Sequence, residues 1–165
     1  SGETAFGKYP LETVRMMAKI AEEVEASHST FTDTSYEGEK NVTSYLSKAA
    51  VKAALRLNTK GLIADTISGK TILSLAAYRG ENIIFAECYS KRVMRELAIS
   101  FGVHAHDMQS DLTTHEFLEV SLTQLMAEKH FDPDSLVTVL AGNFGIDAGA
   151  SYVEISTVKN LLKKK

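Results

Sequence analysis

Apolar residues in the first part of the chain recur every three or four positions, which is typical of amphipathic helices. Over residues 10–26 they alternate with charged residues, and Pro10 suits a first helical turn. A second pattern of this kind runs over 40–57. A Ser- and Thr-rich stretch at 27–38 lies between them without periodicity and is expected to be a linker or loop. The expected apolar faces are Leu11, Val14, Met17, Ala21 and Val24 in the first helix, and Val42, Leu46, Ala49, Ala50, Ala53 and Leu57 in the second.

From residue 62 onward, short apolar runs alternate with helical patterns. Alternating strands and helices favour a parallel sheet that carries helices on both faces. Residues 142–151 join the last two strands without a helix, so the final strand is expected to be antiparallel. The predicted fold is a three-layer α/β sandwich around a mostly parallel five-stranded sheet. The expected strands are 62–67, 82–87, 103–108, 136–141 and 152–158, and the expected helices are 70–78, 91–101 and 114–130.

Composition and charge exclude several classes of protein. The 165 residues are 44% hydrophobic and carry a formal net charge of −3, which gives no bulk attraction to nucleic acid or to a membrane surface. The basic run at 163–165 is interpreted as a solvated tail. Cys88 is the only cysteine, so it is expected to be a small buried hydrophobe and not part of a disulfide within one chain. No signal-peptide pattern or membrane-length apolar run is present, and we expect a cytoplasmic protein.

The segment that follows the first expected strand carries the most distinctive chemistry. Thr66 lies just before Ser68, Gly69, Lys70 and Thr71, at the start of the helix expected over 70–78. Free backbone N–H groups at a helix start, the helix dipole, hydroxyl groups and a lysine together favour an anion. We therefore expect a phosphorylated small molecule to bind here, at the carboxyl ends of the strands, where the loop 142–151 would face it. A serine-capped helix with an incidental glycine is the alternative interpretation.

Two other groups of residues suggest different chemistry. A nucleoside-triphosphate P-loop requires a glycine where this chain has Ala64, and no expected strand ends in an Asp that would hold magnesium. His104 and His106 flank Ala105 in an expected strand and therefore point to the same face. Two imidazoles can ligate a metal, but no third ligand has a compelling position, so a surface pair at a strand end is the preferred interpretation.

The opening of the chain and the order of its later motifs resemble pyruvate kinase. Ser1–Ala5, Gly7–Pro10 and the helix that follows are similar to the end of that family's catalytic barrel. The later matches, in the family's order, are 49–55, 66–71, 78–79, 95–103 and the Gly142 loop. The resemblance divides the chain into the end of the barrel at 1–27, with a leftover barrel helix, a linker at 28–38, and a C-terminal regulatory α/β domain at 39–165.

The resemblance also implies roles for individual residues. Thr66, Ser68, Gly69, Lys70 and Thr71 match the loop that grips a phosphate of the activator fructose 1,6-bisphosphate in many members. The flap that closes over the sugar is matched by Gly142, Asn143, Gly145 and Gly149. Many members carry an aromatic and a basic residue around this flap and the preceding helix, where this chain has Asn143, Phe144, Asp147 and Glu128 beside Lys129. A monophosphate effector, or none, is therefore as consistent with the chain as the bisphosphate.

The function that the resemblance implies belongs to a longer protein. Pyruvate kinase transfers phosphate from phosphoenolpyruvate to ADP in glycolysis with Mg²⁺ and K⁺, and its catalytic groups lie upstream of the matched region. We expect the fragment to be inactive, with no catalytic residue, metal or cofactor of its own. Its expected partners are a sugar phosphate or other phosphorylated effector, and further copies of itself, as in the family's tetramers. A stand-alone α/β domain that binds a small phosphorylated ligand is the alternative.

Overall fold

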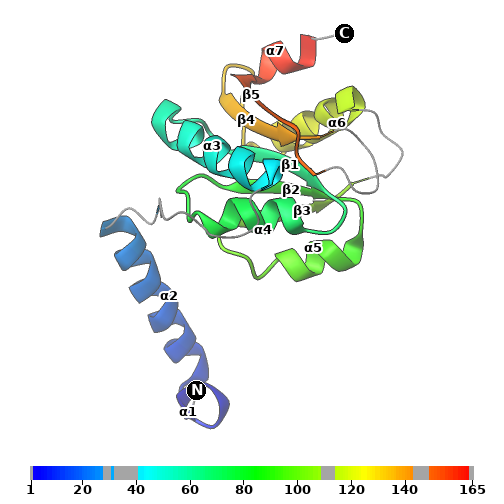
Figure 1. Cartoon of the computed structure of the whole chain (residues 1–165). Coiled ribbons are helices and arrows are strands. Elements are labelled where there is room, and N and C mark those ends of the chain that lie inside the picture. Colours follow the sequence, from blue (N-terminus) through cyan, green and yellow to red (C-terminus); the bar gives the residue numbers. More distant parts are fainter. Residues whose placement is uncertain (1, 28–30, 32–40, 109–113, 143–148, 164–165) are drawn as a thin grey trace. The chain divides into compact units, whose positions relative to one another are not determined.

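The computed structural model describes residues 2–27, 31, 41–108, 114–142 and 149–163. It divides into two compact units, residues 1–30 and 31–165 (Figure 1). The first unit consists of α1 (Gly2–Ala5), which was not expected, and α2 (Pro10–Ser27), which confirms the helix predicted to begin at Pro10. No side chain of either helix is buried. Among the described residues, none of the helices combines the length and apolarity needed to cross a bilayer.

The second unit is built on one five-stranded sheet with the order β3-β2-β1-β4-β5. Strands β1, β2, β3 and β4 are parallel, and β5 is antiparallel to β4. The mostly parallel sheet and its antiparallel last strand are therefore confirmed. The strands are β1 (Leu62–Thr66), β2 (Ile84–Cys88), β3 (Val103–Asp107), β4 (Leu136–Ala141) and β5 (Tyr152–Thr157).

Three helices cover one face of the sheet: α3 (Val42–Leu57), α4 (Lys70–Ala77) and α5 (Lys91–Leu97) (Figure 1). Alternate strand residues such as Leu62, Ala64 and Ala86 face these helices because successive side chains of a strand point to opposite faces. The buried Cys88 belongs to this core, as predicted. Local signals fix the ends of α3, since the Asn41 side chain accepts a hydrogen bond from the Ser44 N–H (2.8 Å) and Asn58 takes a left-handed conformation.

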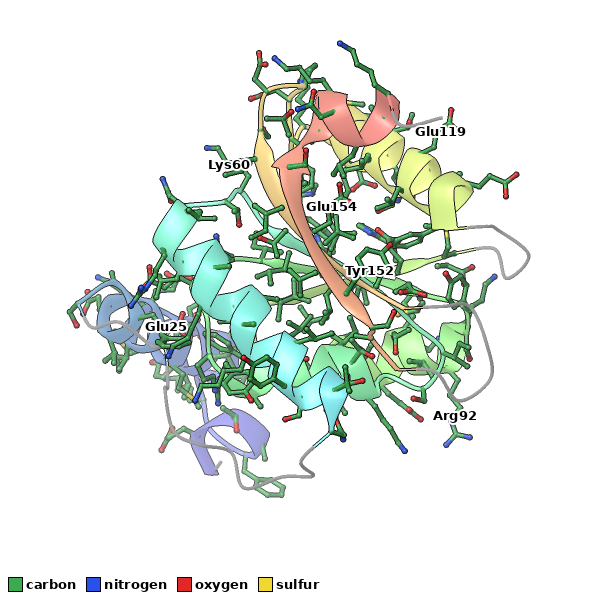
Figure 2. All side chains as sticks on the ribbon, turned by 45° about the horizontal axis from the view of Figure 1, so that its top comes forward. Glu25, Lys60, Arg92, Glu119, Tyr152 and Glu154 are labelled. Atoms are coloured by element: carbon green, nitrogen blue, oxygen red, sulfur yellow. The ribbon has the colours of Figure 1, made fainter. Side chains whose placement is uncertain are left out.

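Two helices cover the opposite face: α6 (Thr114–Ala127) and α7 (Val158–Lys163). Ile63 and Phe85 of the sheet pack there with Phe117 and Leu122 of α6 and Leu161 of α7. Figure 2 shows side chains filling both spaces between helices and sheet, while Arg92 of α5 and Glu119 of α6 point away from it on opposite sides. The structure is therefore the three-layer α/β sandwich that the sequence predicted.

The structure corrects several details of the sequence analysis. Val42 and Leu57, expected on the buried face of α3, are its first and last residues and are 63% and 52% exposed, because the helix ends reach beyond the sheet. The last strand ends at Thr157, and α7 begins at Val158, where the strand was expected to continue. The α7 start is fastened by hydrogen bonds from the Val158 and Lys159 N–H groups to the carbonyls of Ser135 and Pro133.

Candidate functional site

The loop between β1 and α4 turns the chain from strand to helix at the carboxyl edge of the sheet. Thr66 ends β1, and its Oγ1 accepts a hydrogen bond from the Gly69 N–H at 2.8 Å. Gly69 has a φ of 83°, which L side chains rarely adopt, so glycine meets a real backbone requirement here. The Gly69 carbonyl then accepts the first helical hydrogen bond from the Leu73 N–H at 2.9 Å. The loop is thus a defined turn that presents the start of α4.

The start of α4 carries no side-chain cap. Gly69 is the N-cap residue, and as a glycine it has no side chain that could accept a hydrogen bond from the first helical N–H groups. The serine-capped helix considered from the sequence is therefore not what is observed. Ser68 and Lys70 are exposed, and Thr71 is half-buried. Uncapped N–H groups, the positive end of the helix dipole and the Lys70 ammonium together provide donors and positive charge for an anion.

The expected site residues fall into three groups. Ser68, Lys70 and Thr71 lie at the start of α4 with their side chains wholly or partly open to solvent. Thr66 is only 5% exposed, and its oxygen already serves the loop itself. Of the expected flap, Gly142 and Gly149 are described, whereas Asn143 and Gly145 lie outside the described residues. Gly142 follows β4, and β4 pairs with β1, so the loop and the flap leave the same sheet edge from neighbouring strands.

Asp65 and Tyr89 add a polar pair next to the loop that the sequence analysis did not single out. The Tyr89 hydroxyl donates to Asp65 Oδ2 at 3.2 Å. Burial raises the pKa of Asp65, and the hydrogen bond from Tyr89 opposes that shift. A single acidic residue inside the apolar run at 61–65 was the signal that could have pointed to this position. Asp65 therefore places a hydrogen-bonded carboxyl group immediately before the loop, with Tyr89 as its donor.

The two histidines of β3 lie on one face, as the sequence predicted. The ring centroids of His104 and His106 are 4.7 Å apart, and His104 also approaches His130, at 5.4 Å. His106 is largely buried, with 10% of its side chain exposed, so the expected surface pair describes only His104. Within the described ranges, no group of three or more His, Cys, Asp or Glu residues is arranged to hold a metal ion.

Comparisons with known proteins agree with the resemblance seen in the sequence. The family model described as "Pyruvate kinase, alpha/beta domain" matches residues 45–156. Pyruvate kinase of Borreliella burgdorferi is 34% identical over 168 residues, which cover 99% of this chain and 35% of that protein. The pyruvate kinases of Geobacillus stearothermophilus (29% identical) and Clostridium acetobutylicum (32% identical) align with 99% and 86% of this chain, and with 29% and 31% of their own lengths.

The matches cover most of this chain but only part of each relative. This chain spans about a third of the length of the three relatives. The family model, in contrast, covers more than half of the chain, from the first turn of α3 to the last residue but one of β5, and so includes nearly the whole sheet. With its five-stranded sheet and the helices on both faces, the chain therefore belongs to the pyruvate kinase family, through that family's alpha/beta domain.

Proposed function

We propose that this chain is the C-terminal regulatory and assembly region of a cytoplasmic pyruvate kinase. The whole protein would transfer phosphate from phosphoenolpyruvate to ADP, giving pyruvate and ATP. Support comes from the family match and from its extent, since nearly the whole chain aligns with one part of each relative. In this role the region binds a phosphorylated effector and contacts further copies of itself.

The effector's phosphate would bind at the start of α4. The observation that carries this proposal is the uncapped helix N-terminus at the carboxyl edge of the sheet, flanked by the exposed Ser68 and Lys70. A phosphate there accepts backbone N–H and hydroxyl hydrogen bonds and pairs with the ammonium group. Charge-assisted hydrogen bonds of this kind contribute about 1.5–3 kcal/mol each.

The rest of the effector would lie towards the flap at 142–151. This loop follows β4, the neighbour of β1, so a ligand held at α4 reaches it without leaving the sheet edge. The acidic Asp147 in the flap sequence disfavours a second phosphate. We therefore propose a sugar phosphate or another phosphorylated ligand held mainly through one phosphate.

The ions that the resemblance implies for the whole enzyme do not fit this region. No cluster of metal-ligating side chains is present among the described residues. The residues of the proposed site are hydroxyl groups, backbone N–H groups and an ammonium, which bind anions and repel cations. We therefore derive no step through Mg²⁺ or K⁺ here, and effector binding rests on the chain's own donors.

A thermal-shift titration tests the proposed site. We expect fructose 1,6-bisphosphate or a sugar monophosphate to raise the melting temperature, by an amount that grows with ligand concentration. The double variant Ser68→Ala/Lys70→Ala should abolish the shift and keep the fold, because both side chains are exposed. Lys60→Ala is the matched control. Lys60 lies just before β1, at the opposite edge of the sheet, so the variant removes the same charge and should keep the shift (Figure 2).

Two results would contradict the proposed phosphate site at the start of α4. If phosphate, sulfate and sugar phosphates all leave the melting temperature of the unmodified chain unchanged, α4 begins without a ligand role. The proposed function then reduces to assembly. A shift that persists in the Ser68→Ala/Lys70→Ala variant would place the binding site elsewhere on the domain.

A further inference from the structure

A row of three ionisable side chains crosses the sheet on the face that α6 covers. Asp65 of β1 is in register with Glu87 of β2, and Glu87 is in register with His106 of β3. The preceding row on that face contains Ile63 and Phe85, which belong to the core beneath α6. Glu87 is completely buried. A buried carboxylate is costly unless it is paired with a charge and hydrogen-bonded, so its partners decide what it does.

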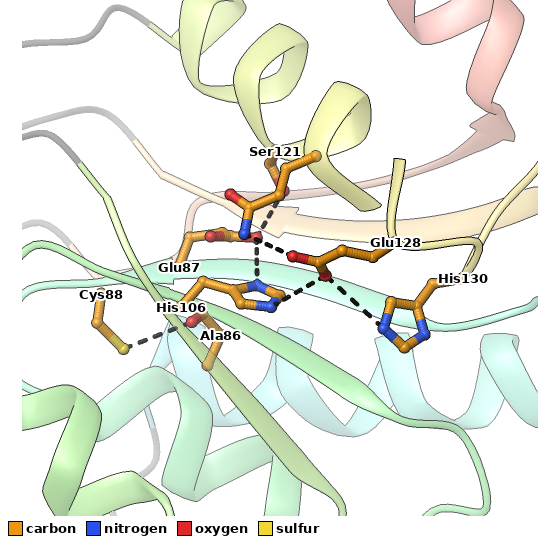
Figure 3. Close-up of polar contacts among 8 residues, drawn as sticks. Ala86, Glu87, Cys88, His106, Ser121, Glu128 and His130 are labelled. Atoms are coloured by element: carbon orange, nitrogen blue, oxygen red, sulfur yellow. Dashed lines mark hydrogen bonds and ion pairs between the residues drawn. The ribbon is translucent and has the colours of Figure 1, made fainter. Parts of the chain in front are cut away.

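Glu87 contacts one helix and one strand. Its Oε1 accepts a hydrogen bond from the Ser121 hydroxyl of α6 at 2.7 Å and lies 3.4 Å from Nδ1 of His106 (Figure 3). Its Oε2 is buried and has no hydrogen-bond partner among the described residues. Ser121 is neutral, so His106 is the cation that Glu87 requires when it is ionised.

The other ring nitrogen of His106 faces a second carboxylate. Nε2 lies 3.5 Å from Oε2 of Glu128, and the same oxygen is 3.7 Å from Nε2 of His130 (Figure 3). Gln124 of α6 orients Glu128 by donating to its Oε1 at 2.9 Å. Both nitrogens of His106 thus face carboxylate oxygens. An imidazolium has two N–H groups and satisfies both, whereas a neutral imidazole has one.

The backbone holds this second carboxylate in place. Beyond the end of α6, Lys129 has a positive φ of 64°, and the His130 N–H donates to the Leu125 carbonyl at 2.9 Å. These features form a helix-terminating turn that fixes the positions of residues 128–130. Movement at the end of α6 is therefore coupled to the contact between Glu128 and His106.

We propose that Glu87, His106 and Glu128 form a proton-operated clamp that fastens the end of α6 to strands β2 and β3. The clamp is closed when His106 is an imidazolium between the two carboxylates. When His106 loses its proton, it can donate to only one of the two carboxyl groups, and its attraction to Glu128 as a cation disappears. The end of α6 then loosens from the edge of the sheet.

The pKa of His106 determines whether stability rises or falls with pH. Its hydrogen bond to Glu87 chiefly raises its pKa above the ordinary 6.5, burial opposes the shift, and the charges of Glu87 and Glu128 add to it. A raised folded-state pKa gives stability that is fully present below 6.5 and is lost as pH rises through the folded pKa. We therefore expect the clamp to open progressively as pH rises above 6.5.

The neighbouring groups are also charged or titratable. They are Asp65 with Tyr89 on the far side of Glu87, Cys88 next to it, and His104 and His130 beside His106. Burial raises the pKa of Cys88 to about 11, above the window in which the clamp opens. Because His104 lies beside His106 and His130 shares the Glu128 carboxylate with it, the test must resolve the individual rings.

Histidine-ring NMR resolves them in the 165-residue chain. Between about pH 5.5 and pH 8.5, His106 should titrate with a midpoint above 6.5, and backbone signals at the end of α6 should follow the same curve. Urea unfolding should show stability falling as pH rises above 6.5. Glu87→Gln keeps an oxygen for Ser121 but removes the charge, so it should lower the pKa of His106 and flatten this pH dependence.

Two further variants keep the result interpretable. Glu128→Gln removes the more exposed carboxylate and should lower the pKa of His106 even if Glu87→Gln fails to fold. Asp107→Asn is the matched control on β3, because Asp107 pairs with Lys91 at 3.7 Å and points to the other face. It should leave the pKa of His106 unchanged.

Several outcomes overturn the proposal. One is a His106 pKa at or below 6.5 in the unmodified chain. Another is an equal pH dependence of stability in the unmodified chain and in Glu87→Gln. If Glu87→Gln does not fold, an unchanged His106 pKa in Glu128→Gln decides against the clamp. Saturable binding of zinc by the histidine rings would show a metal site instead.

Discussion

Thr66 shows that a residue expected to bind a ligand can also hold its own loop together. The sequence predicted it as a phosphate ligand, together with Ser68 and Lys70. In the structure its side chain is buried, and its oxygen accepts the Gly69 N–H. The other two side chains are exposed and remain candidates for contact with an anion. The Thr66 hydroxyl stabilises the loop, and the contribution of its hydrogen bond with the Gly69 N–H can be measured without a ligand.

We predict that Thr66→Val destabilises the domain by about 1–3 kcal/mol, because the buried Gly69 N–H loses its acceptor. Valine has nearly the shape of threonine, so packing changes little. Urea unfolding measures the effect. Thr66→Ser is the control, since it keeps the oxygen and should cost less. Equal stability of the valine variant and the unmodified chain would show that the hydrogen bond contributes nothing.

Elements with a clear apolar pattern were predictable from the sequence, and the shortest helices were not. The helices α2 and α3 show helical spacing and the strands β1 to β5 are short apolar runs, and their positions were predicted within a few residues. α1 and α7 have one turn or little more, too short to establish a helical period. Long-range contacts were also missed. Ser121 and Glu87 are 34 residues apart, and only the folded sheet and α6 bring them together.

The helix α7 offers a test at the scale of the element. Leu161 is almost completely buried against the α6 face, so Leu161→Ala should destabilise the domain by about 2–5 kcal/mol. Asn160→Ala changes the exposed neighbour in the same turn and should alter stability by less than about 0.5 kcal/mol. Thermal or urea unfolding compares the two. Similar small effects would mean that α7 is not part of the folded core.

At the scale of the whole molecule, membership in the pyruvate kinase family does not establish that this chain has the family's activity. The relatives are pyruvate kinases, and this chain matches about a third of each. Phosphoryl transfer requires metal ions, a cationic clamp and alignment of both reactants. The resemblance assigns those groups to the catalytic barrel, outside the region matched here. We therefore expect the activity to require a longer protein of the family.

We predict that the 165-residue chain alone does not catalyse phosphoryl transfer. An assay with phosphoenolpyruvate, ADP, Mg²⁺ and K⁺, coupled to lactate dehydrogenase, should show no turnover above a mock preparation. An intact pyruvate kinase in the same assay is the positive control. Turnover that follows the chain through purification would contradict the prediction and would require a catalytic site within this region.

The register of β2 and β3 constrains how this sequence can diverge. Glu87 and His106 face each other across the two strands. Replacing Glu87 alone removes the partner of a largely buried ring, and replacing His106 alone leaves an uncompensated carboxylate. Exchanging both for apolar residues leaves no unmatched charge and can even stabilise a core. We therefore expect residues 87 and 106 to change together in related sequences, because a change from the polar to the apolar version one residue at a time passes through a less stable intermediate.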